Sequence, residues 1–203
     1  MRIIFFINLF KGLKRLFNNK QNKITNKKEI LWLDLPMNPA YPRNKLWGYR
    51  PTNLINKIVV HQAISEATTV QVNNYHISKD SHIKPGIGCP KIPYHFTIEK
   101  AGTIYKVNEI TDVVWHCSPF NINSIGILLL GDFDGPTHVG KSIPTTQQLE
   151  SLKYLLDMLS LKYNISSNDI YGHKELVGKE NCPGTIILNW LTKYRVEKTD
   201  AKV

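Results

Sequence analysis

The sequence predicts an α/β fold in a single domain, with a central mixed sheet flanked by helices. Two observations support this prediction. Short apolar runs typical of buried strands alternate along the chain with stretches whose apolar residues recur at helical spacing. The length of 203 residues suits one domain with a substantial core, and the hydrophobic fraction of 42% is ordinary for a globular protein.

Residues 1–29 are predicted to form a basic arm ahead of the domain. They hold eight of the 26 basic residues and one of the 16 acidic residues, so most of the net charge of +10 lies here. The apolar block over 3–10 is much shorter than the roughly 20 residues that span a bilayer, and no small-residue cleavage site follows it. Two interpretations stay open: a basic amphipathic helix that lies on a membrane surface or docks on a partner, and a poorly ordered arm.

Residues 30–56 contain four prolines and several aromatic residues, and they are predicted to form an extended lead-in segment on the domain surface. The domain itself is expected over 57–195, with a C-terminal tail over 196–203. Outside the arm no basic run is interleaved with aromatic residues, so no nucleic-acid partner is expected. Cys89 and Cys117 leave two alternatives open, a disulfide in an oxidising compartment and two free thiols.

Strands are predicted where short runs are apolar or rich in β-branched and aromatic residues. The run from Ser124 to Leu130 is apolar after its first residue, as expected of a central strand covered on both faces. Two further runs flank Ala101-Gly102 and are predicted to pair as a hairpin. The expected strands lie at 57–61, 94–99, 103–107, 124–130 and 169–171.

The clearest predicted helix covers residues 145–163. Thr145 and Gln148 fit a capping box at its start, and leucines from Leu149 to Leu159 recur on one face. Two shorter helices are expected at 68–81 and 185–194.

Three residues stand out as metal ligands. His61 and His173 each close a short apolar strand, and the ends of strands are where α/β proteins usually build sites. Cys182 follows in the run Asn-Cys-Pro-Gly. Two imidazoles and one thiolate suffice to hold a catalytic zinc ion (Zn²⁺), which leaves its fourth position to water. A zinc site is therefore expected at the rim of the sheet.

The other histidines are expected to serve no chemical role of this kind. His76, His82 and His138 lie in or beside polar segments and are expected to face solvent. His95 follows Tyr94 directly in a predicted strand, so it is expected to point to the opposite face of the sheet.

Eight short blocks surround the three candidate ligands in a fixed order. The series resembles the zinc-dependent N-acetylmuramoyl-L-alanine amidases (type 2), the superfamily of phage endolysins and peptidoglycan recognition proteins. The resemblance covers about residues 57–195. The blocks are Ile58-Val59-Val60-His61, Tyr94-His95-Phe96-Thr97-Ile98, Gly102-Thr103-Ile104-Tyr105, Trp115-His116, Asn123-Ser124-Ile125-Gly126-Ile127, Gly131-Asp132-Phe133, Gly172-His173 and Cys182-Pro183-Gly184.

The resemblance implies a role for four residues. His61, His173 and Cys182 would bind the zinc, and Tyr94 would lie beside it and help to polarise the substrate carbonyl. Bound zinc lowers the pKa of water to about 7 and acts as a Lewis acid. The bond attacked would be the lactyl-amide between muramic acid and L-alanine, and Tyr94 would donate its phenolic hydrogen to the oxyanion that forms.

Further site residues follow from neighbouring blocks. Trp115 and His116 are expected to line the substrate cleft and Asn123 to bind backbone or substrate, although a structural role stays open for His116 and Asn123. Phage members of the family carry a catalytic lysine six residues after the last histidine and two before the cysteine. The interval here is one residue longer, so counting forward gives Lys179 and counting back gives Glu180. A cation would stabilise the oxyanion, whereas a carboxylate would suit proton transfer.

These features predict a zinc amidase that degrades peptidoglycan in the bacterial cell wall. The alternatives are a non-catalytic peptidoglycan-binding module and a virion-associated structural protein. The enzyme would act at the wall, and three routes to it are open: phage lysis, virion delivery, and a membrane-associated arm formed by residues 1–29. Residues 1–29 would then contact a membrane surface or a virion partner.

Overall fold

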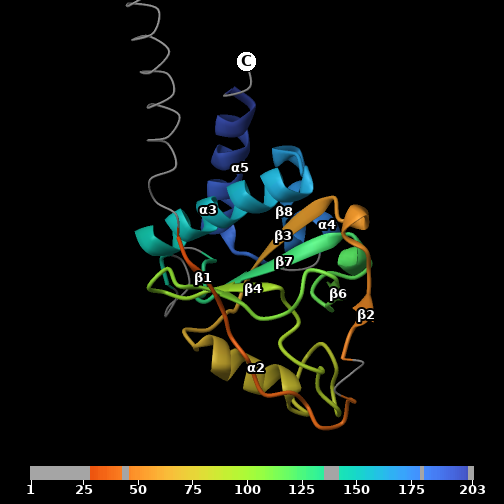
Figure 1. Cartoon of the computed structure of the whole chain (residues 1–203). Helices are drawn as coiled ribbons and strands as arrows, with labels where there is room; N and C mark the ends of the chain where they lie inside the picture. The colour runs from red at the N-terminus through yellow and green to blue at the C-terminus, as the bar shows by residue number, and fades with distance from the viewer. Residues whose placement is uncertain (1–27, 43–45, 135–141, 179–180, 201–203) are drawn as a thin grey trace, which may run out of the picture.

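A computed structural model describes residues 28–42, 46–134, 142–178 and 181–200. They form a six-stranded mixed sheet with the strand order β1-β5-β4-β7-β3-β8, flanked by helices, as the sequence predicts (Figure 1). Strands β4, β7, β3 and β8 run parallel, whereas β5 is antiparallel to β4 and carries β1 at the edge. The strands of this sheet are β1 Ile30–Trp32, β3 Lys57–Gln62, β4 Phe96–Ile98, β5 Ile104–Lys106, β7 Ser124–Leu129 and β8 Ile170–Gly172.

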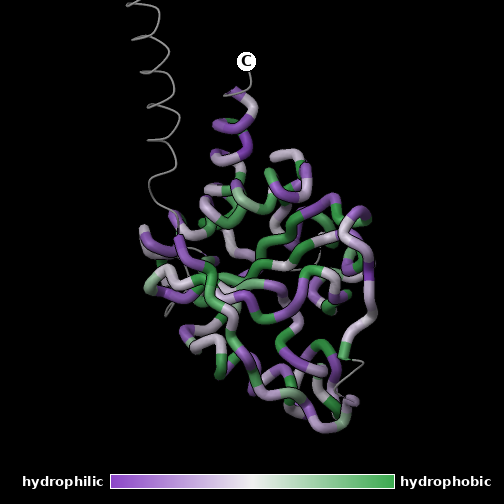
Figure 2. Tube along the Cα trace, in the orientation of Figure 1, coloured by the Kyte–Doolittle hydropathy of each residue, from purple (hydrophilic) through white to green (hydrophobic). Residues whose placement is uncertain are grey.

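The two central strands divide the core between the two faces of the sheet. In β3, Ile58 and Val60 point into the larger apolar cluster, so His61 projects from the opposite face. Every residue of β7 is buried, which confirms the prediction of a strand covered on both sides. Figure 2 shows the hydrophobic residues concentrated in these strands.

Helices cover the two faces unequally. On one face, α3 (Thr146–Tyr163) and α5 (Thr185–Asp200) contribute leucines and isoleucines to the larger cluster. On the other face lies α2 (Thr69–Ile77), whose Val72 packs in a smaller cluster with Tyr94 and Leu128 (Figure 1). No helix in the described ranges is both long and apolar enough to cross a membrane.

The ends of the helices agree with the predicted ones in part. The capping box of Thr145 and Gln148 is present at the start of α3, as predicted. Helix α2 ends at Ile77 rather than at 81, because the Ser78 backbone is extended and its hydroxyl donates to the Tyr75 carbonyl oxygen at 2.8 Å. Helix α5 continues beyond the predicted end at 194, to Asp200.

The lead-in segment is fastened to the domain by Arg50, whose side chain is fully buried. Its guanidinium donates to the carbonyl oxygens of Ile110 (3.1 Å), Asn121 (2.8 Å) and Ser124 (2.7 Å). Burial lowers the pKa of Arg50 to about 10, against a smaller opposing effect of Asp112. Next to it, β2 (Gly48–Tyr49) pairs with β6 (Asp112–Val113). The remaining short elements are η1 Thr52–Leu54, η2 Phe120–Ile122, η3 Ser167–Asp169 and α4 His173–Val177.

Candidate metal centre

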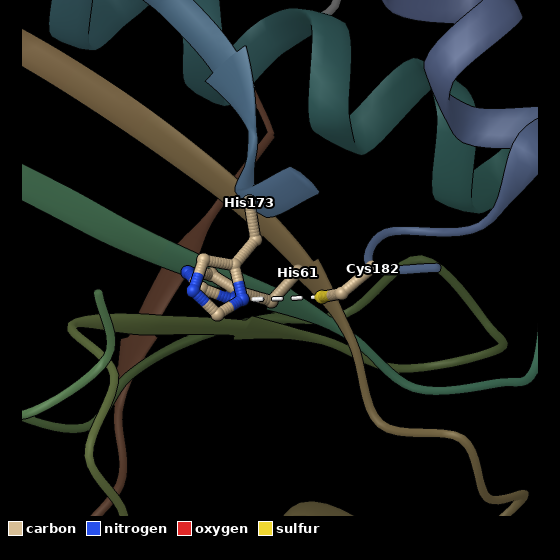
Figure 3. A group of neighbouring side chains, drawn as sticks. All are labelled: His61, His173 and Cys182. Atoms are coloured by element: carbon tan, nitrogen blue, oxygen red, sulfur yellow. Dashed lines mark hydrogen bonds between the residues drawn. The ribbon is translucent and has the colours of Figure 1, made fainter. Parts of the chain in front are cut away.

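The three candidate ligands meet at the carboxyl ends of parallel strands β3 and β8. His61 is the fifth residue of β3, and His173 is the first residue of α4, directly after β8. The register pairs Val60 with Gly172, so the residues that follow them lie side by side. Cys182 approaches from the loop before α5 (Figure 3). This is the edge at which parallel α/β sheets usually place their sites.

The Cys182 loop is held in place by hydrogen bonds to both neighbouring elements. The Lys174 backbone N–H at the start of α4 donates to the Cys182 carbonyl oxygen at 2.8 Å. From β3, the Gln62 side-chain amide donates to the Asn181 carbonyl oxygen at 3.1 Å. Gly184 adopts a left-handed conformation with φ of 89°, and its N–H closes the turn on the Asn181 carbonyl oxygen. Gln62, which no motif in the sequence marks as a site residue, therefore fixes the position of the thiol.

The geometry fits a tetrahedral zinc ion. One nitrogen of each histidine and the Cys182 sulfur lie within 4.8 Å of one another. The distance from His61 Nδ1 to Cys182 Sγ is 3.6 Å. Zinc–nitrogen and zinc–sulfur bonds at a tetrahedral angle place the two ligand atoms about 3.5 Å apart. The donor set of two imidazoles and one thiolate is also the type that zinc prefers, so these residues fit the metal.

The surroundings keep the ligands in the form that a metal needs. Burial, followed by the proximity of His116 and His173, holds the pKa of His61 well below its ordinary value, so the imidazole is neutral. Its Nε2 lies 3.1 Å from His116 Nδ1, which leaves Nδ1 on the side of Cys182. The Gln62 backbone N–H lies 3.4 Å from Cys182 Sγ and donates to it, which stabilises negative charge on the sulfur.

A cleft of about 620 Å³ opens onto the metal centre. Tyr94 lines it, and its ring centroid lies 5.0 Å from that of His61. Trp115 and His116 also line the cleft. Asn123 does not: it lies directly before β7, at the opposite end of the sheet, and its amide donates to Asn56 Oδ1 at 3.2 Å. The prediction that Asn123 binds substrate therefore has no support from its position.

Two predictions about the other histidines need correction. His76 is buried, with 3% of its surface exposed, because residues 78–93 fold back over the end of α2 and bring Cys89 N–H to the His76 carbonyl oxygen. Burial, followed by the charge of His82, lowers the pKa of His76 to about 3. His82 is exposed, as predicted, and the hydroxyl oxygen of Tyr75 lies 3.0 Å from His82 Nδ1. His76 lies four residues after buried Val72, on the same face of α2. This spacing was the signal in the sequence from which its burial could have been predicted.

The prediction that His95 points to the opposite face of the sheet from Tyr94 is wrong. Tyr94 precedes β4 and packs in the same smaller cluster as Leu128, so it does not follow the alternation of the strand. His95 lies on that side of the sheet as well, with its ring 5.8 Å from that of His116. Its Nδ1 accepts from the Gly126 N–H at 2.9 Å, and its Nε2 lies 3.1 Å from the Asp112 carbonyl oxygen.

Other predicted residues are placed as follows. Cys89 and Cys117 are buried free thiols, which leaves the disulfide alternative without support. Lys179, Glu180 and His138 lie outside the described residues, as does most of the arm over 1–29. Of the three predicted catalytic residues, Tyr94, Lys179 and Glu180, the described part of the chain includes Tyr94, which lies beside the candidate ligand His61.

Comparison with known proteins identifies relatives of this chain. Residues 50–185 match the family model described as N-acetylmuramoyl-L-alanine amidase. The peptidoglycan-recognition protein SC1a/b of Drosophila simulans is 28% identical over 149 residues, which cover 72% of this chain and 77% of that protein. The endolysin of Escherichia phage T7 is 30% identical over 109 residues, 54% of this chain and 70% of the endolysin.

Solved structures share the fold. The N-acetylmuramoyl-L-alanine amidase LysC from Clostridium intestinale URNW superposes with a TM-score of 0.64 and 25% identity, covering 84% of this chain and 99% of that one. Drosophila PGRP-LB superposes with a TM-score of 0.61 at 19% identity, covering 81% of this chain and 94% of that one, which supports the fold alone. The matched segment spans most of the described sheet and all three candidate ligands. The chain therefore belongs to the N-acetylmuramoyl-L-alanine amidase family.

Proposed function

We propose that this protein is a zinc-dependent amidase that hydrolyses the bond between N-acetylmuramic acid and L-alanine in peptidoglycan. The observation that carries the proposal is the complete ligand set of His61, His173 and Cys182 at the floor of an open cleft. Family membership supports peptidoglycan as the partner, whether it is cleaved or only bound. The LysC amidase and the phage endolysins among the relatives favour cleavage.

In this proposal His61, His173 and Cys182 would hold the zinc, which when bound would supply a nucleophilic water at neutral pH and Lewis-acid polarisation of the substrate carbonyl. Tyr94 orients the amide: its phenolic O–H donates to the carbonyl oxygen and more strongly to the oxyanion that develops there. The apolar wall beside it, which includes Val72 and Leu128, excludes water from the reacting amide.

Proton transfer needs a further group. None of the described residues that line the cleft is Asp or Glu. We assign the second catalytic role to the segment between His173 and Cys182, with Lys179 as an oxyanion partner or Glu180 as a proton carrier. Exchanging Lys179 for Met and Glu180 for Gln, one at a time, identifies which of the two is required for turnover.

The proposed site of action is the bacterial cell wall. Residues 1–29 would contact a membrane surface or a virion component there, because their positive charge suits an anionic surface. Removing residues 1–29 should then abolish association with vesicles that contain anionic lipid, or with virions, while leaving hydrolysis of purified wall intact.

The test of the proposed function is the release of stem peptides with a free L-alanine amino terminus from purified wall. Zinc-loaded protein should release them, and Cys182→Ser should not, while retaining its circular dichroism spectrum. Cys89→Ser is the matched control, because Cys89 is also a buried thiol but does not line the cleft. Binding to wall without any release by zinc-loaded protein would refute the amidase and leave a peptidoglycan-binding module.

A further inference from the structure

We propose that His116 is a positioning residue that fixes the tautomer of His61, through a chain of hydrogen bonds that starts at the Phe120 carbonyl oxygen. The inference rests on the proposed metal site, and it assigns His116 a role other than contact with substrate. Four polar groups form the chain: the Phe120 carbonyl, the Ser124 hydroxyl and the two imidazoles of His116 and His61.

The direction of each hydrogen bond follows from the first. Ser124 Oγ lies 2.6 Å from the Phe120 carbonyl oxygen, which can only accept, so the hydroxyl donates its single hydrogen there. Ser124 Oγ also lies 3.2 Å from His116 Nε2. Because the hydroxyl hydrogen is already used, the oxygen accepts in this second contact and His116 Nε2 carries a hydrogen.

The same reasoning extends to the metal ligand. His116 is 4% exposed, and its described ring partners include no carboxylate, so the ring is neutral and has one N–H. With the hydrogen on Nε2, His116 Nδ1 is a bare acceptor, and it lies 3.1 Å from His61 Nε2. His61 Nε2 therefore donates, and the lone pair of His61 Nδ1 is left free on the side of Cys182 Sγ, 3.6 Å away.

Packing holds the chain in register. The His116 ring lies directly against β7 at Gly126, where an added Cβ would come within 2.7 Å of His116 Cγ. Gly126 is not in the left-handed region, so space rather than backbone conformation requires glycine here. The strand thus leaves room for the imidazole between Ser124 Oγ and the His61 ring, which lies nearly perpendicular to it at an angle of 84°.

Without His116 the opposite tautomer would be favoured. A hydrogen on buried His61 Nε2 would then have no acceptor, and leaving this donor unsatisfied would destabilise that tautomer. A hydrogen on His61 Nδ1 could instead be donated to Cys182 Sγ. That form places a hydrogen where a metal would bind, so zinc would have to displace it. Partners of this kind typically change metal affinity ten- to a hundredfold.

The first experiment uses the metal-free full chain with ¹⁵N-labelled histidine, and long-range ¹⁵N–¹H spectra assign the hydrogen on each ring. We expect His61 and His116 both to carry it on Nε2. In Ser124→Ala the His116 signals should shift toward a mixture of tautomers. Ser151→Ala is the matched control, because this buried hydroxyl likewise donates to a carbonyl oxygen, that of Gly102, but in α3. Identical His116 spectra in the two variants would overturn the proposal, as would a hydrogen on His61 Nδ1 in the unmodified protein.

The second experiment measures zinc dissociation constants by competition with a chelator. His116→Phe should move the His61 hydrogen to Nδ1 and raise the zinc dissociation constant ten- to a hundredfold. His116→Asn should lose less affinity, because its amide oxygen can still accept from His61 Nε2. An unchanged tautomer and a dissociation constant within twofold in His116→Phe would overturn the proposal. If His116→Phe does not fold, the spectra of the unmodified protein and of Ser124→Ala decide.

The two proposals can fail separately. The tautomers are measured without metal or substrate, so a protein that releases no stem peptides can still show the predicted spectra. Conversely, release of stem peptides by a protein whose His61 carries its hydrogen on Nδ1 would support the amidase and refute the role of His116.

Discussion

Replacing Arg50 with Met should lower the free energy of unfolding by about 3 kcal/mol. The variant leaves the carbonyl oxygens of Ile110 and Ser124, in buried hydrogen bonds, and of Asn121, in a partly buried one, without their donor. Each unsatisfied group costs about 1–3 kcal/mol, or roughly 6 kcal/mol for the three at the middle of that range. The lowering of the Arg50 pKa to about 10 corresponds to a net penalty of roughly 3 kcal/mol for the charged form in the folded protein, which we expect the variant to recover. The difference between these two free energies, about 3 kcal/mol, is the predicted loss in the free energy of unfolding.

The assay is urea unfolding of the metal-free protein, followed by circular dichroism. Lys100→Met is the control that removes one positive charge from the surface, where Lys100 Nζ pairs with Glu66 at 3.0 Å and both side chains are at least half exposed. That exposed pair should contribute less than about 1 kcal/mol. If Arg50→Met also lost less than about 1 kcal/mol, the three carbonyl oxygens would have found other partners and the reasoning would be refuted.

Three further predictions concern pH, capping and metal. The folded protein keeps His76 neutral down to a pKa of about 3, whereas the unfolded chain binds a proton below about pH 6.5, so stability falls as the pH drops through this window. From pH 7 to 5 the unmodified protein should lose about 2 kcal/mol more than His76→Gln in urea unfolding, and equal losses would contradict neutral burial. Thr145→Ala should cost about 1 kcal/mol through loss of the capping box, whereas exposed Thr146→Ala should not, and thermal melts of the two compare them directly. Free zinc at a hundred times its dissociation constant should stabilise the protein by about 2.7 kcal/mol but leave Cys182→Ser unchanged, and stabilisation of that variant would place the metal elsewhere.

The features predicted correctly from the sequence have causes that are local in the chain. The capping box at Thr145 needs only Gln148, three residues away. The β7 strand is recognisable because a run buried on both faces is apolar at nearly every position. The structure brings His61 and His173 together with Cys182, and both histidines could be selected as candidate ligands because each occurs where an apolar strand ends.

The features that were missed depend on residues far apart in the sequence. The acceptors of Arg50 lie 60 to 74 residues away, and they are backbone carbonyl oxygens, which every residue carries. His76 sits in a polar helix and is buried by a segment that follows it. Asn123 lies within the segment that matches the family model, but it enters β7 from the end opposite the cleft. Resemblance of a stretch of sequence to a family therefore does not by itself place each side chain at the site.

The position of β3 between β7 and β8 has a consequence for how the protein is made. His61 comes early in the chain, whereas strand β8 and the candidate ligands His173 and Cys182 come more than 100 residues later. During synthesis β3 can pair with β7 well before β8, His173 and Cys182 have emerged. The nascent chain would therefore hold only one of the three candidate ligands until its last elements dock, and under the proposed function metal binding would wait for completion of the sheet. A chain that stops short of Cys182 would bury most of its core and still have no place to hold the ion.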